Sequence, residues 1–209
     1  MIDDVAQSII NKWDLNIYDP SPIQIPNSSR TVLAQLFRDL GYRIGAEIGT
    51  LGGQYAKNLK RNNPDLTLYC VDPWEIYDGI QYFDQSKLTK YYNRAVKLLE
   101  GYKNVHFIKK KSMDAVKDFE DGSLDFVYID GNHELEYVIN DIIHWSKKIR
   151  TGGLVSGHDY LIVDEEYDDW QNDVKAAVLC YTKAHQINPF FVMDEGTLKR
   201  TGSWFWVKQ

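Results

Sequence analysis

The amino-acid sequence predicts an α/β fold: a single domain built on one doubly wound sheet. From Arg43 onward, short apolar runs alternate with amphipathic stretches of helical period. Such alternation is typical of parallel strands joined by crossover helices. The chain then ends in two aromatic-rich runs separated by a glycine-containing turn, which predicts an antiparallel C-terminal hairpin. We therefore expect a largely parallel sheet with helices on both faces, closed by this hairpin.

Five strands are expected before the hairpin, each a short run of mostly apolar residues. They are Ile44–Ile48, Leu66–Val71, Val105–Ile108, Leu124–Ile129 and Gly153–Ser156, and the hairpin strands are Phe190–Met193 and Ser203–Val207. Helices are expected near Gln54–Arg61, Lys87–Tyr102, Met113–Phe119, Leu135–Ile149 and Asn172–His185. Within the fourth of these helices, apolar residues recur at helical spacing and predict a buried stripe: Val138, Ile142, Trp145 and Ile149.

The first 42 residues predict an N-terminal arm, distinct from the domain of residues 43–209. Asp3 to Trp13 is expected to form a short helix, and a proline-punctuated connector follows it. A second helix is expected over Thr31–Leu40, capped by Ser28 or Ser29 and ended by Gly41. Two interpretations of the connector stay open: a lid over the substrate, or a packed arm.

Length and charge restrict the class of function. The chain has 209 residues, enough for one domain, with 24 Lys and Arg against 30 Asp and Glu and a net charge of −6. Binding to nucleic acid or to an anionic membrane needs concentrated basic side chains, so we expect neither, and a small-molecule substrate instead. The first residues lack the pattern of a signal peptide, and no window resembles a membrane span. A cytoplasmic protein is expected, and no motif indicates its oligomeric state.

Sheets of this kind bind ligands beyond the carboxyl ends of their strands, so the residues there are the candidate site. The first predicted strand runs into the segment Glu47-Ile48-Gly49-Thr50-Leu51-Gly52-Gly53. Asp72 follows the second strand, 23 residues after Gly49, close to the offset of about 20 at which an acid binds ribose hydroxyls. The glycine turn and the spaced acid predict an adenosine-type cofactor. The alternative is that Asp72 only caps the turn after its strand.

Glu47 indicates which cofactor this is. Its carboxylate would repel a pyrophosphate but attract the ammonium and sulfonium groups of S-adenosylmethionine, because unlike charges attract. Gly49, Gly52 and Gly53 also depart from the dinucleotide spacing GxGxxG. S-adenosylmethionine is therefore favoured. A nicotinamide-dependent oxidoreductase and a non-catalytic adenosyl-binding protein are the alternatives.

These residues resemble the class I S-adenosylmethionine-dependent methyltransferases. Ala46-Glu47-Ile48-Gly49-Thr50, with Gly53 and Tyr55, is similar to their catechol- and caffeoyl-CoA-type O-methyltransferase branch. Ser123 to His133 resembles the family's fourth strand and its end, and Gly152 to Tyr160 resembles the fifth. The Asp-Gly-x-His and Gly-His-Asp-Tyr forms are similar to small O-methyltransferases of natural products and surface sugars. The resemblance spans about Arg43 to Tyr160 and implies a Rossmann-like sheet of seven strands.

The resemblance also implies a role for each matching residue. Glu47 and Gly49 would hold the methionine part of the cofactor, Asp72 the ribose, and Trp74 would border the adenine. Ser112 would line the adenine pocket, although Lys110-Lys111-Ser112 stands where the family usually has Gly-Asp-Ser; Asp114 is a candidate for the missing acid. The full predicted cofactor set is Glu47, Gly49, Thr50, Gly53, Asp72, Trp74, Ser112, Met113 and Asp130.

The transfer itself needs a positioned hydroxyl and a group that takes its proton. Asp130, His133, His158 and Asp159 follow two neighbouring strands and are expected to converge. His133 is the predicted general base, because imidazole titrates near neutral pH, with Asp130 and His158 as the other catalytic residues. The alternative for His133 is a cap on the helix that starts near Glu134.

A divalent metal ion is a further expectation from the resemblance. In metal-dependent relatives an ion is held by acids after the fourth and fifth strands, and the matching residues are Asp130, His158 and Asp159. Oxygen ligands favour Mg²⁺, whereas a histidine shifts the preference toward Mn²⁺, Fe²⁺ or Zn²⁺. Without a metal, His158 would be a second base oriented by Asp159.

Aromatic residues near the site suit a sugar, a glycosylated metabolite or a phenol as the acceptor. The acidic stretch Asp164–Trp170 is either a solvated face or a lid. As a lid, it would close Tyr160, Tyr167 and Trp170 on the substrate, opposite a wall formed by Tyr77, Tyr82 and Phe83.

Overall fold

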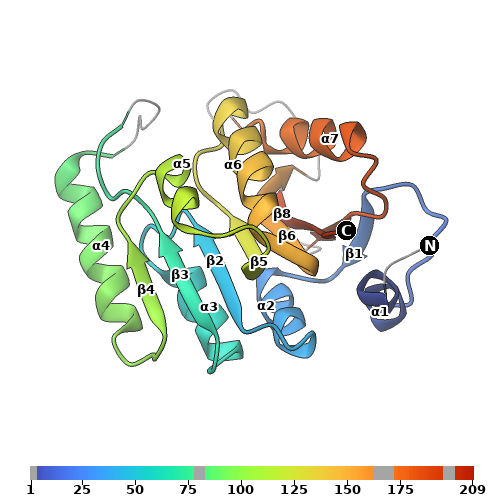
Figure 1. Cartoon of the computed structure of the whole chain (residues 1–209), viewed down its shortest axis with the longest axis horizontal. Helices are drawn as coiled ribbons and strands as arrows, with labels where there is room; N and C mark the ends of the chain where they lie inside the picture. The colour runs from blue at the N-terminus through green and yellow to red at the C-terminus, as the bar shows by residue number, and fades with distance from the viewer. Residues whose placement is uncertain (1–3, 78–82, 162–171, 195–200) are drawn as a thin grey trace.

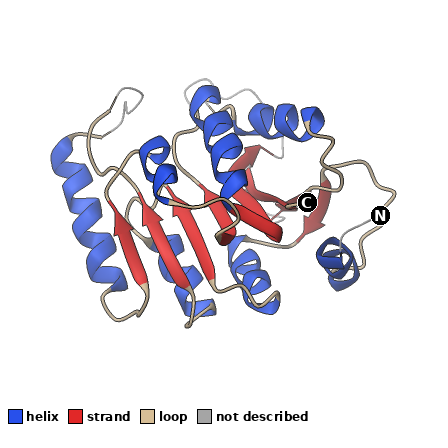
Figure 2. Ribbon diagram, viewed as in Figure 1, coloured by secondary structure: helices blue, strands red, loops and turns tan. Residues whose placement is uncertain are grey.

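The computed structural model describes residues 4–77, 83–161, 172–194 and 201–209. One eight-stranded sheet lies between two layers of helices, as Figures 1 and 2 show. Its strands are β1 (Ile23–Pro26), β2 (Ile44–Ile48), β3 (Thr67–Val71), β4 (Val105–Ile108), β5 (Leu124–Ile129), β6 (Ile149–Leu161), β7 (Phe191–Asp194) and β8 (Thr201–Val207). Their order in the sheet is β1-β7-β8-β6-β5-β2-β3-β4.

The predicted fold class is confirmed. Strands β6, β5, β2, β3 and β4 are parallel neighbours, and β8 runs antiparallel to both β6 and β7. The helices are α1 (Asp4–Lys12), α2 (Arg30–Asp39), α3 (Gln54–Asn62), α4 (Gln85–Leu99), α5 (Ser112–Ala115) with the 3₁₀ turn η1 (Val116–Asp118), α6 (Leu135–Lys148) and α7 (Val174–Ala184). Within the described part of the chain, no helix combines the length and apolar character that a membrane crossing would need.

The sheet has one strand more than the seven expected. Strand β1 belongs to the segment that we assigned to the connector, and it pairs in parallel with β7 at the edge of the sheet. Ile23 and Ile25 are buried, whereas Gln24 and Pro26 are exposed. Pro26 is compatible with an edge position, where its missing N–H costs no ladder hydrogen bond. The alternation of buried and exposed residues in β1 spans only four positions of a proline-rich segment, so it did not predict a strand.

The sheet separates two apolar clusters. Helices α1, α2 and α3 pack on one face, where Phe37 of α2 stacks on Phe126 of β5 and Leu59 of α3 belongs to the same cluster. Helices α5, α6 and α7 pack on the other, and the predicted stripe on α6 is buried there through Val138, Ile142 and Trp145. Both faces of the central strands are therefore covered, which is the usual condition of parallel sheets.

The strand register brings the carboxyl ends of four strands to one edge of the sheet. Ile48 of β2 lies opposite Val71 of β3 and Ile129 of β5, and Ile129 lies opposite Gly157 of β6. The loops that follow β2, β3 and β5 contain Gly49, Asp72 and Asp130, and His158 lies within β6, next to Gly157. The predicted site residues thus lie along this edge.

Candidate functional site

The loop from β2 to α3 is closely packed at two of its three glycines. Gly49 has φ +90°, and a Cβ added there would lie 2.1 Å from the carbonyl oxygen of Asp130. Gly53 has φ +76°, and a Cβ there would lie 3.0 Å from Cα of Ala95 on α4. Only glycine adopts such a backbone without strain and leaves room for these neighbours. The glycine turn is therefore required by the packing of the loop itself.

Glu47 is a buried acid near the end of β2. Glu47 is 2% exposed, and it lies opposite Cys70 of β3 and Tyr128 of β5 in the strand register. Its Oε2 atom has no hydrogen-bond partner among the described residues, and burial raises the pKa of Glu47 to about 8. A buried polar atom without a partner is costly, so it needs a structural or functional reason. A cationic ligand group would provide one. The neighbouring Thr50 is buried as well.

Asp72 joins the loops that follow β2 and β3. Its Oδ2 accepts the Leu51 N–H at 2.9 Å, and its Oδ1 accepts the Trp74 N–H at 2.8 Å. Burial raises the pKa of Asp72, and these two N–H donors oppose the rise. The capping role, which was the alternative in the sequence, is therefore present. Each carboxylate oxygen keeps a second lone pair, so capping leaves a contact with ribose hydroxyls open.

Trp74 is buried between the two loops, and its predicted place beside the adenine stays a prediction. Its side chain is fully buried, its indole N–H donates to the Leu51 carbonyl at 2.8 Å, and its ring packs edge-on against Tyr92 at 5.0 Å. A second ring, Phe107 of β4, lies 6.1 Å away. We therefore assign Trp74 a packing role, in which it ties the two loops together.

Ser112 meets an acid that the sequence analysis did not select. Its hydroxyl donates to Asp141 of α6 and accepts the indole N–H of Trp145 at 2.8 Å. Asp141 is 5% exposed, and burial raises its pKa to about 7. Asp114, the sequence candidate for this acid, is instead exposed and pairs with Lys117 at 2.8 Å. The signal for Asp141 was its spacing, because it shares the buried face of α6 with Trp145.

The neighbouring Met113 is partly buried against the cluster under α5, α6 and α7. Its predicted place along the adenine pocket stays a prediction.

The two histidines converge on one carboxylate. His133 Nε2 lies 2.9 Å from Asp159 Oδ2, and His158 Nδ1 lies 3.0 Å from Asp159 Oδ1. Burial alone would lower the pKa of His133, but the adjacent Asp159 carboxylate outweighs it and the pKa is raised. Burial would raise the pKa of Asp159, but the two imidazoles hold it well below its usual range. The strand ends thus bring these residues together as expected.

The backbone of Asp159 is held in an unusual conformation. Its φ is +58°, in the left-handed region, which Asp adopts more readily than most residues with a Cβ. The Asn172 side chain donates to the Asp159 carbonyl at 3.0 Å, and the Trp204 indole donates to the His158 carbonyl at 3.0 Å. In this conformation the Asp159 carboxylate contacts both histidines.

Arg30 is a site residue that sequence reasoning missed. It is the first residue of α2, and its Nη1 lies 3.6 Å from Asp130 Oδ2. Its guanidinium also lies over the Tyr55 ring, 5.6 Å from the centroid. Burial raises the pKa of Asp130, and the nearby Asp159 adds to the rise. No local pattern marks Arg30, because its partner is 100 positions further along the chain.

A possible set of metal ligands differs from the predicted one in its histidine. Among the described residues, ligand atoms of Asp130, His133 and Asp159 lie within 4.8 Å of one another. His133 replaces His158 in this set, because the chain after β5 returns toward Asp159 while His158 faces the other carboxylate oxygen. The donor types suit a divalent ion.

The aromatic walls are described only in part. Tyr82, Tyr167 and Trp170, with the whole acidic stretch 164–170, lie outside the described residues. Tyr160 is buried, and the Phe83 ring packs edge-on against Tyr91 at 5.6 Å. The Tyr77 ring lies 5.9 Å from Tyr137, and burial raises its pKa to about 12.

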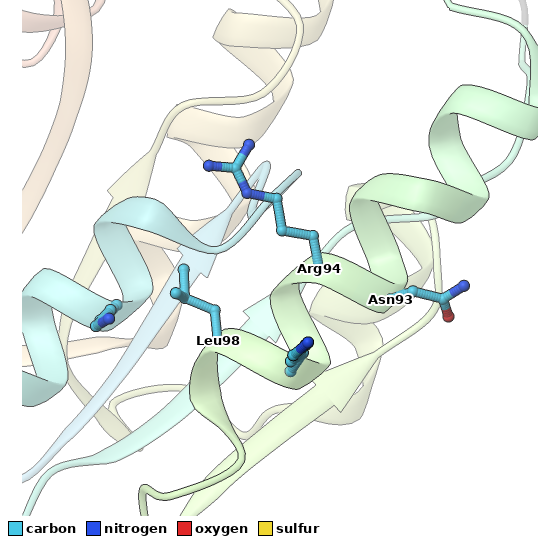
Figure 3. Close-up of a pocket in the computed structure, with 5 residues that line it drawn as sticks. Asn93, Arg94 and Leu98 are labelled. Carbon is cyan, nitrogen blue, oxygen red and sulfur yellow. The ribbon is translucent and has the colours of Figure 1, made fainter.

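Two open cavities lie away from these residues. One, of about 500 Å³, is lined by Lys57, Asn93, Arg94, Lys97 and Leu98. Figure 3 shows Arg94 and Leu98 projecting from α4 toward α3. The other, of about 450 Å³, lies between α2 and α3. Neither is lined by a predicted site residue, so we do not assign them to the candidate site.

The contact between His133 and Asp159 makes a testable prediction. Asp159→Asn removes the negative charge, so we expect the pKa of His133 to fall from a value above its ordinary 6.5 to one below it. NMR titration of the imidazole signals measures this change. The exposed Asp114→Asn is the control and should leave the His133 titration unchanged.

The raised pKa of His133 also determines the direction in which stability changes with pH. The stabilisation from protonated His133 is fully present below about pH 6.5 and is lost as pH rises through the folded-state pKa. An unchanged His133 titration in Asp159→Asn would contradict the contact.

Comparisons with known proteins place this chain among methyltransferases. The family model described as "Methyltransferase domain" matches residues 46–160. The uncharacterized protein R132 of Acanthamoeba polyphaga mimivirus is 31% identical over 144 residues, which are 67% of this chain and 58% of the relative.

Solved structures show a similar fold. An O-methyltransferase family protein from Burkholderia thailandensis has a TM-score of 0.62 at 12% identity, covering 86% of this chain and 55% of the other. The O-methyltransferase from Bacillus cereus, in complex with S-adenosylhomocysteine, has a TM-score of 0.61 at 16% identity, covering 100% and 92%. The chain thus spans little more than half of the mimivirus and Burkholderia proteins.

Proposed function

Because this chain belongs to the methyltransferase domain family, we propose that it transfers a methyl group from S-adenosylmethionine to a hydroxyl group of a small acceptor. One observation carries the proposal: Glu47 is a buried acid with an unpartnered oxygen, placed directly before a glycine turn at the ligand-binding edge of the sheet. A cationic ligand favours the charged form of Glu47 and satisfies this oxygen, whereas a pyrophosphate would oppose the ionisation of Glu47.

The cofactor contacts follow from the loop geometry. Glu47 would pair with the ammonium group of the methionine part, and ion pairing would return it to its charged form. Asp72, already held by two backbone N–H groups, presents its remaining lone pairs to ribose hydroxyls. Asp141 would supply the acid beside Ser112 that is missing from the segment Lys110-Lys111-Ser112 after β4. When bound, the cofactor supplies an electrophilic methyl group.

The histidine pair removes the proton of the acceptor hydroxyl. A His158 protonated on Nδ1 donates to Asp159 and keeps the Nε2 lone pair as a proton acceptor. Asp159 thereby orients the base and stabilises the imidazolium that forms. His133, with its raised pKa, shares the same carboxylate and is the second candidate for the base. Both imidazoles are partly exposed, so an acceptor can reach them.

A divalent ion fits the donor types of the same site. Asp130, His133 and Asp159 would hold it, and a bound ion would lower the pKa of the acceptor hydroxyl. His133 would then serve as a ligand rather than as a base.

The acceptor class rests on the aromatic residues at this edge. Tyr77 and Tyr137 offer ring surface to a sugar, a glycosylated metabolite or a phenol.

Calorimetric titration with S-adenosylhomocysteine tests the proposed cofactor. We expect saturable binding, with no binding of NADH followed by its fluorescence. Absence of S-adenosylhomocysteine binding at millimolar concentration would refute the proposal. A fluorescence change with NADH in the same preparation would point instead to an oxidoreductase.

A further inference from the structure

Arg30 gives the candidate site a fixed positive charge of its own. Its Nη1 lies 3.6 Å from Asp130 Oδ2, and the two side chains are 39% and 20% exposed, so the pair is partly open to solvent. Within the described residues, Arg30 is the basic side chain that forms an ion pair with Asp130. Asp130 itself is held in place, because its N–H donates to the Ile48 carbonyl at 2.8 Å.

The start of α2 fixes where the guanidinium lies. Ser29 caps the helix by accepting the Thr31 N–H at 3.3 Å, and the Arg30 carbonyl accepts the Tyr55 hydroxyl at 3.1 Å. The Tyr55 ring then lies beneath the guanidinium, 5.6 Å away, as in a cation–π contact. These contacts anchor Arg30 from its backbone to its charged end. Its position beside Asp130 is therefore built into the fold.

We propose that Arg30 is the resident counter-ion of the site: its guanidinium occupies the place beside Asp130 that a divalent ion would need, and so lowers the affinity of the site for metal. The inference rests on the proposed function and deepens it, because it concerns which cation, a metal ion or a side chain, neutralises Asp130 in the same site.

The distance between His133 and Asp159 does not distinguish a metal-bound site from a metal-free one. A separation of 2.9 Å between His133 Nε2 and Asp159 Oδ2 fits a hydrogen bond, and it equally fits two neighbouring ligands of one ion. Asp130 is different, because an ion on its carboxylate would stand a few ångströms from a permanent positive charge. Like charges at that separation repel, and arginine cannot relieve the repulsion by losing its proton.

Metal binding measured directly tests the proposal. Calorimetric titration with Mn²⁺ would compare the wild-type chain with Arg30→Gln, and Mn²⁺ electron paramagnetic resonance would count the bound ions. We expect Arg30→Gln to bind Mn²⁺ at least tenfold more tightly than the wild type. The second change Asp130→Asn, added to Arg30→Gln, should abolish this gain. Equal affinity in the wild type and Arg30→Gln would overturn the proposal.

Two further variants separate charge from packing. Arg38→Gln removes an exposed arginine of the same helix that pairs with Asp39, and it should leave Mn²⁺ affinity at the wild-type value. Arg30→Lys keeps the charge and should bind Mn²⁺ as weakly as the wild type. If Arg30→Lys bound Mn²⁺ as tightly as Arg30→Gln does, the positive charge of residue 30 would not be what weakens metal binding.

The two proposals fail in different measurements. Loss of S-adenosylhomocysteine binding by the wild type refutes the proposed function and leaves the Mn²⁺ comparison valid. Unchanged Mn²⁺ affinity in Arg30→Gln refutes the counter-ion and leaves the cofactor result untouched.

Discussion

A Gly49→Ala variant is expected to lose about 2–4 kcal/mol of folding free energy and most of its affinity for S-adenosylhomocysteine. The new Cβ would lie 2.1 Å from the Asp130 carbonyl oxygen and 2.6 Å from Cα of Gly131. These are backbone atoms of the β5 end, so they cannot rotate away as a side chain would. Relief of the clash must move the loop that carries Asp130. Chemical denaturation and calorimetry measure the two losses.

Two other glycines serve as matched controls for Gly49. Gly41 has φ +73° with open space around its Cβ position, so Gly41→Ala isolates the backbone cost of about 1–2 kcal/mol. Gly101 has neither the positive φ nor a neighbour within 4 Å, and Gly101→Ala should change stability by less than about 0.5 kcal/mol. Stability of Gly49→Ala equal to that of Gly41→Ala would show that the steric account is wrong.

Glu47→Gln is expected to stabilise the ligand-free protein while weakening S-adenosylmethionine binding at least tenfold. The amide has no charge at any pH, so folding no longer requires either a buried carboxylate or a proton held well above the ordinary pKa of 4.5. It also removes the charge proposed to pair with the ligand's ammonium group. Thermal unfolding and calorimetric titration should therefore move in opposite directions. Weaker binding accompanied by lower stability would instead indicate a damaged fold.

The raised pKa of Glu47 also predicts the direction in which stability changes with pH. Burial raises its pKa to about 8 from an ordinary value near 4.5, so the folded state keeps a proton that the unfolded state has lost. Between these two values the contribution of Glu47 makes stability fall as pH rises. Glu47→Gln should flatten this part of the profile, whereas the exposed control Asp114→Asn should not. Ligand affinity of the wild type should rise toward pH 8. A profile of Glu47→Gln parallel to the wild type would contradict the raised pKa.

Local sequence patterns predicted the elements and the edge on which the site lies. Strands β2, β4 and β5 have the bounds that their apolar runs indicated. Asp72 and Asp159 were found because each follows a predicted strand, and strand ends in a parallel sheet share one edge. Trp74 was placed by the same rule, but an indole at a strand end can also turn inward, and here it is buried between the loops.

What the sequence by itself determined was therefore the α/β fold, the glycine turn and the acids at the strand ends, since periodicity and turn chemistry are set by residues a few positions apart. The tertiary structure decided the pairing of β1 with β7, the acid beside Ser112, the shared carboxylate of His133 and His158, and the contact of Arg30 with Asp130. These contacts join side chains or strands distant in the chain, and they depend on strand register and helix placement. No local pattern specifies such a geometry, because each partner has an ordinary sequence environment until the sheet and its helices bring the two together.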